Sequence, residues 1–455
     1  MTYLICLLFD CVPSASARDI YYSISAEEVL WNYVPEGSNL ITGANFSDMD
    51  KVFVENSADR IGPVFVKALY FEYTDASFST RVLRDADLEH MGFLGPVIRA
   101  AVGDVLHVTF FNQASMPYSL HPHGVQYDKQ SEGAPYNDGV NSTSGFVCPQ
   151  CMYQYTWRVP RSAGPAAGDV STVIWPYHSH THEVADPASG LVGFIVVCAS
   201  NGCAEGAHLP PPTNSYRYGL PHGIDQEVFL LFYIINENES NLLDTNIAMF
   251  TTNVTDVADE GFVESNLKHA INGYLMGNQP MIDVVVGTTV RWYVSGMVLA
   301  RLRVSATFPT LILCLIAGFG NEADLHTVHW HGQTLVHWGR NVVDTLSVSP
   351  AEFYTLDMQV ENNTGIFLLH CHVDDHMMAG MMTRYSILPC ANCGGSNGSG
   401  SDSSVDATTV ALAVVFTLVG VGVLVFIVVR LRKNGWVWSS LRPFNSQRAA
   451  PLLSE

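Results

Sequence analysis

Short apolar segments recur along most of the chain, and Gly, Pro and Asn separate them. They are rich in β-branched and aromatic residues, which favour strands over helices. The clearest segments are 105–112, 190–198, 227–235, 288–296 and 353–360. Many short strands with turn residues between them are typical of antiparallel sandwiches. The pattern therefore predicts an all-β fold.

Two blocks of this pattern are separated by residues 199–225, where several prolines interrupt all periodicity. A length of 455 residues allows two or three domains. We therefore predict a first sandwich over 20–198, a linker over 199–225 and a second sandwich over 226–389. Residues 390–406 are rich in Gly and Ser, which predicts a flexible tether.

The longest apolar run lies near the C-terminus. Residues 407–429 carry no charge, and a run of about 20 apolar residues is long enough to cross a bilayer as a helix. Basic residues follow directly, so the positive-inside rule predicts a single transmembrane helix with a cytoplasmic tail over 430–455. Residues 1–17 are predicted to be a weak signal peptide, because Asp10 interrupts their apolar core. The folded part would then lie outside the cell, at the plasma membrane, or in the lumen of the secretory pathway.

An extracellular location permits disulfides and N-linked glycans. The candidate disulfide cysteines, whose pairing the sequence leaves open, are Cys148, Cys151, Cys198, Cys203, Cys390 and Cys393. A structural zinc ion between the first two is a weaker interpretation. The Asn-x-Ser/Thr sequons are Asn45, Asn141, Asn238, Asn253, Asn362 and Asn397.

Composition and charge exclude two classes of protein. The chain has 22 Lys and Arg against 43 Asp and Glu, and its formal net charge is −21. A surface this acidic repels phosphate, so nucleic acid is not an expected partner. Hydrophobic residues make up 48% and charged residues only 14%, which excludes disorder for most of the length. The 17 His, 10 Cys and 14 Met call for a chemical explanation.

Many of the histidines fall in four short clusters. Their sequences are HPHG at 121–124, HSH at 178–180, HTVHWH at 326–331 and HCHVDDH at 370–376. On an extended strand, two histidines separated by one residue leave the same face, so the pair can be divided between neighbouring metal ions. A single pair is more often a wet surface loop. Four pairs in one chain favour metal binding.

The last two clusters and the residues after them add sulfur ligands. The predicted set is His326, Cys371, His376 and Met381. Two imidazoles, one thiolate and a weak thioether are the ligands of a blue copper electron-transfer site, whereas zinc would not recruit the thioether. Because His370 and His372 flank Cys371 in the chain, an electron at this site has a short covalent route to any metal that they bind.

The four clusters resemble, in sequence and in order, the copper-binding signatures of multicopper oxidases. The segments ESNLKHAINGYLMGN and GNEADLHTVHWHG, together with YNDG and SGLVG, are similar to the ceruloplasmin and hephaestin branch. The resemblance covers nearly all of residues 25–389. It implies tandem cupredoxin-like Greek-key β-sandwiches and four coppers per functional unit. Such enzymes take electrons singly at a type 1 copper and reduce O₂ to water at a cluster of one type 2 and two type 3 coppers.

The same resemblance assigns ligands position by position. His326, Cys371, His376 and Met381 match the type 1 ligands. His121 and His329 match the type 2 pair. The matches to the type 3 ligands are His123, His178, His180, His331, His370 and His372.

A substrate site is implied beside the type 1 copper. The ferroxidase branch has a Glu, a His and an Asp there, and Glu264, His269 and Asp375 match them. Carboxylate oxygen suits Fe(II), although either acid alone would be read as a solvated side chain. We predict a ferroxidase that uses Fe(II) and O₂, beside an iron permease or exporter. The alternatives are a laccase-like phenol oxidase or a cuprous oxidase, and, in another class, a non-enzymatic A-domain protein like those of coagulation factors.

The chain departs from the branch in three respects. Ceruloplasmin-like proteins have six cupredoxin domains, whereas this chain has two blocks, so we predict that three copies associate head to tail into a ring. Closure within one chain and an incomplete gene model are the alternatives. Residues 298–319 interrupt the family pattern and resemble a translated intron. Cys198 also lacks the earlier cysteine with which it would pair in ceruloplasmin, because 170–174 contains none.

Overall fold

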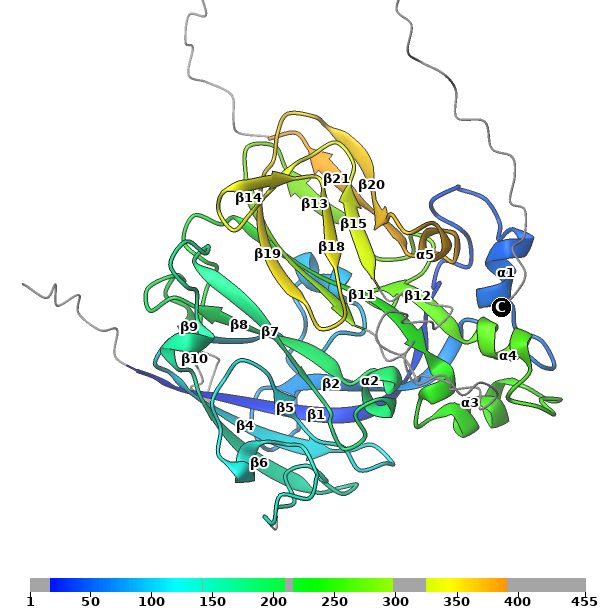
Figure 1. The fold of residues 1–455 in the computed structure, drawn as a ribbon, viewed down its shortest axis with the longest axis horizontal. Helices are drawn as coiled ribbons and strands as arrows, with labels where there is room; N and C mark the ends of the chain where they lie inside the picture. Colours follow the sequence, from blue (N-terminus) through cyan, green and yellow to red (C-terminus); the bar gives the residue numbers. More distant parts are fainter. Residues whose placement is uncertain (1–16, 141, 209–215, 298–324, 391–455) are drawn as a thin grey trace, which may run out of the picture. The chain divides into compact units, whose positions relative to one another are not determined.

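The computed structural model describes residues 17–140, 142–208, 216–297 and 325–390, and it confirms the all-β prediction (Figure 1). The strands of the first sandwich are β1 (Asp19–Asn32), β2 (Val64–Tyr73), β3 (Ile98–Ala101), β4 (Val105–Asn112), β5 (His121–Pro122), β6 (Met152–Arg158), β7 (Thr172–His178) and β8 (Val192–Cys198). They form two four-stranded sheets, in the orders β2-β1-β4-β6 and β3-β8-β7-β5. The pairs β1 with β4 and β3 with β8 are parallel, so both sheets are mixed.

A second sandwich follows the same plan. Its strands are β11 (Gln226–Asn236), β12 (Leu267–Ile271), β13 (Ile282–Val285), β14 (Thr289–Met297), β15 (His326–Trp330), β16 (Leu335–His337), β17 (Asn341–Val343), β18 (Thr345–Val348), β19 (Phe353–Gln359), β20 (Gly365–Cys371) and β21 (Met382–Leu388). The sheets have the orders β12-β11-β14-β19-β16-β17 and β13-β21-β20-β15-β18. Each again contains one parallel pair, β11 with β14 and β13 with β21.

The remaining elements are short. A two-stranded sheet of β9 (Ala207–His208) and β10 (Tyr216–Arg217) lies between the sandwiches in sequence. The α-helices are α1 (Asp48–Val54), α2 (Ala185–Ser189), α3 (Leu243–Phe250), α4 (Glu260–Ser265) and α5 (Asp374–Met378). The 3₁₀ helices are η1 (Ala86–Met91), η2 (Lys129–Ser131), η3 (Arg161–Ala163) and η4 (Glu237–Glu239).

The burial of the strands shows how the two sandwiches pack. In β4, buried positions alternate with partly exposed ones, as expected for a strand with one face in the core. By contrast, β8 is buried at every position and β11 at all positions except its ends. Side chains of β8 such as Phe194 share a core with Phe229 and Tyr233 of β11 and Tyr293 of β14. The sheets that contain β8 and β11 therefore face each other, and each is covered on both sides.

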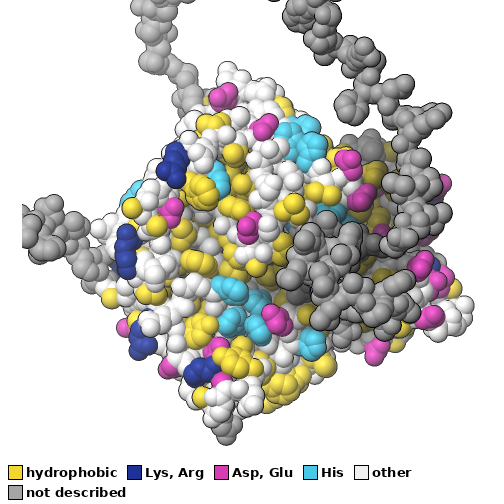
Figure 2. All heavy atoms as spheres, viewed as in Figure 1, with side chains coloured by type: hydrophobic (Ala, Val, Ile, Leu, Met, Phe, Trp, Pro, Cys, Tyr) yellow, Lys and Arg dark blue, Asp and Glu magenta, His cyan; other side chains and the backbone are white. Residues whose placement is uncertain are grey.

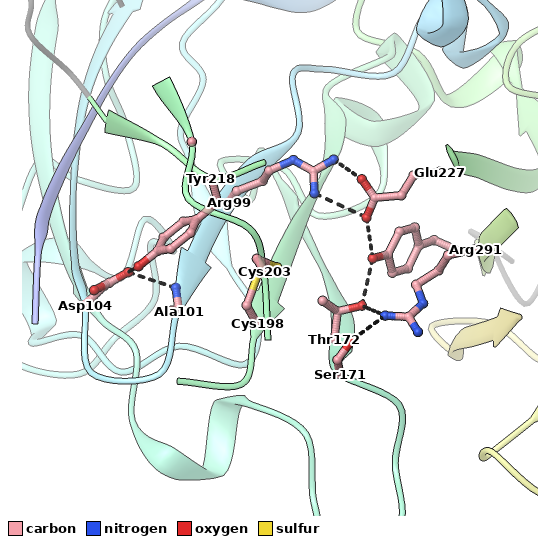
Figure 3. Close-up of a disulfide and its surroundings, with 12 residues drawn as sticks. Arg99, Ala101, Asp104, Ser171, Thr172, Cys198, Cys203, Tyr218, Glu227 and Arg291 are labelled. Atoms are coloured by element: carbon pink, nitrogen blue, oxygen red, sulfur yellow. Dashed lines mark hydrogen bonds and ion pairs between the residues drawn. A yellow bond between two sulfur atoms is a disulfide. The ribbon is translucent and has the colours of Figure 1, made fainter. Parts of the chain in front are cut away.

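A chain of buried polar groups also crosses this interface (Figure 3). Arg99 of β3 forms an ion pair with Glu227 of β11, which is 2% exposed. The Tyr293 hydroxyl donates to Glu227 at 2.6 Å and lies 2.8 Å from the hydroxyl of Thr172 in β7. Arg291 donates to that Thr172 hydroxyl at 2.8 Å. Buried polar groups are costly unless they are paired, so this network favours one relative placement of the two sandwiches.

The cysteines pair with near neighbours in the chain. Cys148 is bonded to Cys151, and Cys198 to Cys203 (Figure 3). The interpretation of the first pair as a zinc site is therefore wrong, because a disulfide leaves no thiolate for a metal. Cys198 pairs with a cysteine five residues later, whereas the family pattern pairs it with an earlier cysteine. Cys390 is disulfide-bonded as well.

Several sequence predictions fall beyond the part of the chain that the structure describes. They include the insertion at 298–319, the membrane segment at 407–429, the tail at 430–455 and almost all of 1–17 and 390–406. No helix within the described ranges is both long enough and apolar enough to cross a membrane.

Candidate metal centres

One candidate centre surrounds the thiol of Cys371 at the end of β20. The Nδ1 atom of His326, the first residue of β15, lies 3.8 Å from the Cys371 sulfur. The Nδ1 atom of His376 in α5 lies 3.6 Å from it. All three residues are buried, and they form the thiol-centred group. The sequence prediction of these three as neighbours is matched by the geometry.

The local fold brings these ligands together. Strands β15 and β20 are paired antiparallel, which sets His326 near the end of β20. Two residues separate the end of β20 from the start of α5, which carries His376. Met381 is fully buried. Its N–H donates to the His376 carbonyl at 3.0 Å, and its own carbonyl accepts from the Cys371 N–H at 3.1 Å. The backbone thus anchors the predicted thioether ligand to two members of the thiol-centred group.

Burial also sets the protonation of this group. It lowers the pKa of His326 to about 3 and lowers the pKa of His376, because a charged imidazolium is poorly solvated there. It raises the pKa of the Cys371 thiol for the same reason. Neutral imidazoles are the form that binds a metal, and a soft thiol beside two of them fits copper.

A first histidine group lies in the first sandwich and consists of His121, His123, His178 and His180. Strands β5 and β7 pair so that His121 faces His178. The Nε2 atoms of His123 and His178 are 3.2 Å apart, and the ring of His180 lies 5.0 Å from that of His121. Burial lowers the pKa of His123 to about 4 and that of His178 to about 3.

The glycine of the HPHG sequence has a local reason. Gly124 has a φ of 75°, in the left-handed region. A Cβ atom at this position would lie 2.3 Å from the ring of Trp175 in β7. Only glycine lets the chain turn this closely against β7, and the turn directly follows His123.

A second histidine group lies in the second sandwich and consists of His329, His331, His370 and His372. Strands β15 and β20 pair so that His329 faces His370. The Nε2 atoms of His331 and His370 are 3.1 Å apart, and the ring of His372 lies 5.7 Å from that of His329. The strand pairing and the short Nε2–Nε2 distance repeat those of the first histidine group.

Backbone carbonyls orient the imidazoles in both histidine groups. The Nδ1 atom of His178 donates to the Ser179 carbonyl at 2.9 Å, and that of His370 donates to the Cys371 carbonyl at 2.8 Å. His121 and His329 donate in the same way, to the carbonyls of Glu132 and Asp344. A proton fixed on Nδ1 leaves Nε2 as the free lone pair for a metal.

The two histidine groups are separate. Within the described ranges, each set of close ligand atoms draws its residues from one sandwich only. Figure 2 shows histidine side chains at several separate places on the face in view. Of the predicted cluster, the structure thus assembles two half-sites of four histidines each.

Of the three predicted iron ligands, His269 and Asp375 lie next to His376. The ring of His269 in β12 is centred 5.3 Å from that of His376. Burial lowers the pKa of His269 to about 3, and its Nδ1 has no hydrogen-bond partner among the described residues. Glu264, near the end of α4, has a pKa raised by partial burial. Asp375 is exposed and directly precedes His376 in α5. The structure therefore brings His269 to the thiol-centred group, and Asp375 directly precedes His376 of that group in the chain. Glu264 lies in α4, the helix that precedes β12, which carries His269.

Sequence reasoning missed the residues that support the first histidine group. Ser179 donates to Asp186 of α2, and Asn241 also donates to Asp186. The sequence signal was Asp186 inside the largely apolar stretch VADPASGLVGFIVVC, which follows HSHTHE. An acid in such a stretch is buried only when polar partners satisfy it.

Comparisons with known proteins agree with this geometry. Two family models described as multicopper oxidase match residues 72–202 and 246–389. The chain is 39% identical over 376 residues to the Mus musculus protein named ferroxidase HEPHL1, 36% over 395 residues to Rattus norvegicus ceruloplasmin and 34% over 390 residues to Mus musculus hephaestin. These matches cover 81%, 84% and 84% of this chain but only 29%, 34% and 30% of the respective relatives. The chain thus spans about a third of their length.

Proposed function

Because this chain belongs to the multicopper oxidase family, and within it to the ceruloplasmin and hephaestin-like branch, we propose that it is a ferroxidase. In the proposed reaction, each of four Fe(II) ions gives up one electron. One O₂ takes up these four electrons and four protons and becomes two molecules of water. Support comes from the ligand sets of the three groups and from a relative whose name is ferroxidase.

One observation carries the choice of iron. His269 is a buried, neutral imidazole whose Nδ1 has no partner among the described residues, and its ring is centred 5.3 Å from that of His376, a ligand of the thiol-centred group. A buried polar atom without a partner is costly, and a bound metal ion would satisfy this one. Carboxylates on α4 and α5 would complete a hard site for Fe(II). The net charge of −21 favours the approach of cations.

Each of the three ligand groups has its own role in the proposed reaction. The thiol-centred group with Met381 would hold a type 1 copper, and the two histidine groups would hold the type 2 and type 3 coppers. Copper, when bound, supplies one-electron redox chemistry at the first and the four-electron reduction of O₂ at the others. Burial lowers the pKa of His123, His178 and His326 among these ligands and so favours their neutral form. Backbone carbonyls orient the Nε2 atoms of His121, His178, His329 and His370. Cys371 also joins the thiol-centred group to His370 and His372 through the backbone.

The test compares two substrates in purified full-length chain. Replacing Glu264 and Asp375 by Ala together should raise the KM for Fe(II), while oxidation of a phenol survives. The matched control replaces Glu260 of α4 and Asp374 of α5, which are exposed carboxylates on the same helices. This control should leave both activities near those of the unmodified chain, since neither residue is a predicted ligand. Equal loss of both activities in the Glu264 and Asp375 variant would contradict an iron site.

A complete copper cluster requires both histidine groups, and we propose that it forms between copies of the chain. Each group has its four histidines on one sandwich. Head-to-tail association would place the first histidine group of one copy against the second group of the next, and three copies would close a ring. The mass of the copper-loaded protein in solution tests this. A monomer that carries the full four coppers would rule it out.

The cellular setting is proposed from sequence alone. The apolar run at 407–429 and the basic residues after it support a single-pass protein of the plasma membrane with the oxidase part outside. An iron permease or exporter beside it would use Fe(III) or supply Fe(II). In sealed right-side-out vesicles of the plasma membrane, added protease should digest the oxidase part and leave the tail intact. A digested tail with an intact oxidase part would contradict this orientation.

A further inference from the structure

The two histidine groups differ in the residue between their paired histidines. In the second group this residue is Cys371, whose side chain turns into the thiol-centred group. In the first group it is Ser179, which is fully buried. The backbone contact is the same in both, because His178 Nδ1 donates to the Ser179 carbonyl and His370 Nδ1 to the Cys371 carbonyl. Ser179 is not a predicted metal ligand, so other contacts must hold its side chain in place.

Ser179 is held by a buried carboxylate. Its hydroxyl donates to Oδ2 of Asp186 at 2.6 Å, and the same oxygen accepts the N–H of His182 at 2.9 Å. Asp186 is completely buried, yet within the described ranges no Lys or Arg forms an ion pair with it. Burial raises its pKa. Such a group is costly, and its hydrogen bonds are what stabilise it there.

The hydrogen bonds continue from Ser179 to the next ligand. The Ser179 hydroxyl accepts the N–H of Ser119 at 2.9 Å, and the Ser119 hydroxyl accepts the N–H of His180 at 2.9 Å. Asp186 thus fixes the segment on both sides of His180, through Ser179 and through the N–H of His182. The imidazoles of His178 and His180 are thereby presented from a backbone with little freedom.

The other oxygen of Asp186 reaches the second sandwich. Its Oδ1 accepts from the side-chain amide of Asn241 at 2.8 Å, just before α3. The N–H of Asn241 in turn donates to the Ser189 hydroxyl at 3.0 Å, at the end of α2. Helix α2 is therefore fastened at two points to the segment that follows β11.

We propose that Asp186 is the positioning residue of the first histidine group, and that it fixes the His-Ser-His segment as the thiol-centred group fixes His-Cys-His in the second. This inference rests on the proposed copper chemistry. Asp186 touches neither metal nor substrate, so it acts only through Ser179, His182 and Asn241. Removal of a group that orients metal ligands typically costs about 10- to 100-fold in metal affinity.

The test measures copper in the full-length chain after dialysis against a competing chelator. Total copper and blue absorbance are recorded separately, so that copper in the histidine groups is distinguished from copper at Cys371. We expect Asp186→Ala to weaken retention by the histidine groups by about 10- to 100-fold and to leave the blue band unchanged. Asp186→Asn should restore most of the loss, because its amide oxygen can still accept from Ser179 while Asn241 turns its own amide.

The matched control is Asp104→Ala. Asp104 is also a buried carboxylate of the first sandwich, and it accepts from the N–H of Ala101 and the hydroxyl of Tyr218 (Figure 3). It accepts from the N–H of Arg18 as well. It should lower the melting temperature of the copper-free chain as Asp186→Ala does, with copper retention unchanged. Should Asp186→Ala fail to fold, Ser179→Ala removes only the hydroxyl and should give the same selective loss.

Three results would overturn the inference. The first is a folded Asp186→Ala or Ser179→Ala chain that retains as much non-blue copper as the unmodified chain. The second is an equal copper loss in Asp104→Ala, which would make the effect one of stability alone. An unmodified chain that binds no copper at all would contradict the proposed function itself, and so is distinguishable from the other two.

Discussion

The thiol-centred group and the two histidine groups meet the demands of metal binding in opposite ways. In the thiol-centred group every close ligand is buried and comes from one sandwich. In each histidine group two of the three closest ligands are partly exposed, and the four histidines supply only half of a predicted cluster. A buried, complete ligand set can work within one chain. In the proposed assembly, another surface would complete each half-exposed set.

The largest effect on activity should follow from removal of the Cys371 sulfur, the centre of the thiol-centred group. Cys371→Ser keeps the size of the side chain and removes the soft ligand, so the blue absorption should disappear. Oxidation of Fe(II) should fall by more than the roughly 10- to 100-fold that removal of a supporting group costs. Copper in the two histidine groups should remain. Loss of all copper on this one substitution would show that the three groups bind copper as a single unit.

The next largest effect concerns the surface that completes each histidine group. A chain with His121 and His123 replaced by Ala should be inactive, and so should a chain with His329 and His331 replaced by Ala. If the cluster forms between copies, mixing the two unfolded chains and refolding them should restore activity. Random head-to-tail mixing leaves about a quarter of the interfaces with both groups intact. If the cluster closes within one chain, no mixture recovers activity, because each chain carries one damaged group.

The sequence predicted the parts of this comparison that depend on local pattern. Residues 105–112 were predicted as a strand and form β4, and the ligands of the thiol-centred group were predicted from residue type and spacing. A periodic pattern tells which face of a strand is buried, but not which distant residue lies against it. The contact between Asn241 and Asp186 and the pairing of Cys198 with Cys203 depend on such distant or loop geometry. The family models match residues 72–202 and 246–389, so the boundaries at 20–198 and 226–389 stay predictions.

Acid should weaken the interface that holds the two sandwiches in place. The Nδ1 of His90 in η1 donates to the Asp87 carbonyl, so its Nε2 is an acceptor, and it receives the N–H of Phe229 in β11 at 3.0 Å. Burial lowers the pKa of His90 from 6.5 to about 4. Between pH 6.5 and pH 4, His90 therefore takes up a proton in the unfolded chain but not in the folded chain. The stability that neutral His90 contributes is present above pH 6.5 and is lost as the pH falls toward 4, on the order of 3 kcal/mol in all.

Urea unfolding of the copper-free chain between pH 7 and pH 4 measures this loss. His90→Gln does not titrate, so its stability should fall less steeply over that range. The control is His222→Gln, since His222 is exposed and the slope should not change. Equal slopes for the unmodified chain and His90→Gln would mean that other groups cause the acid sensitivity.

The smallest effect should separate the second histidine group from the thiol-centred group on the same sandwich. The hydroxyl of Tyr385 in β21 donates to the His331 carbonyl at 2.5 Å. Tyr385→Phe removes one hydrogen bond and should cost about 1 kcal/mol, which weakens copper binding by the second histidine group several-fold. The blue band should not shift, because Cys371 and its two histidines keep their contacts.

Tyr354→Phe is the matched control, since that hydroxyl donates to Glu352 in the same sandwich. A blue band that shifts in Tyr385→Phe would mean that the two groups are coupled through β20 and β21, and that the thiol-centred group is less self-contained than its burial indicates.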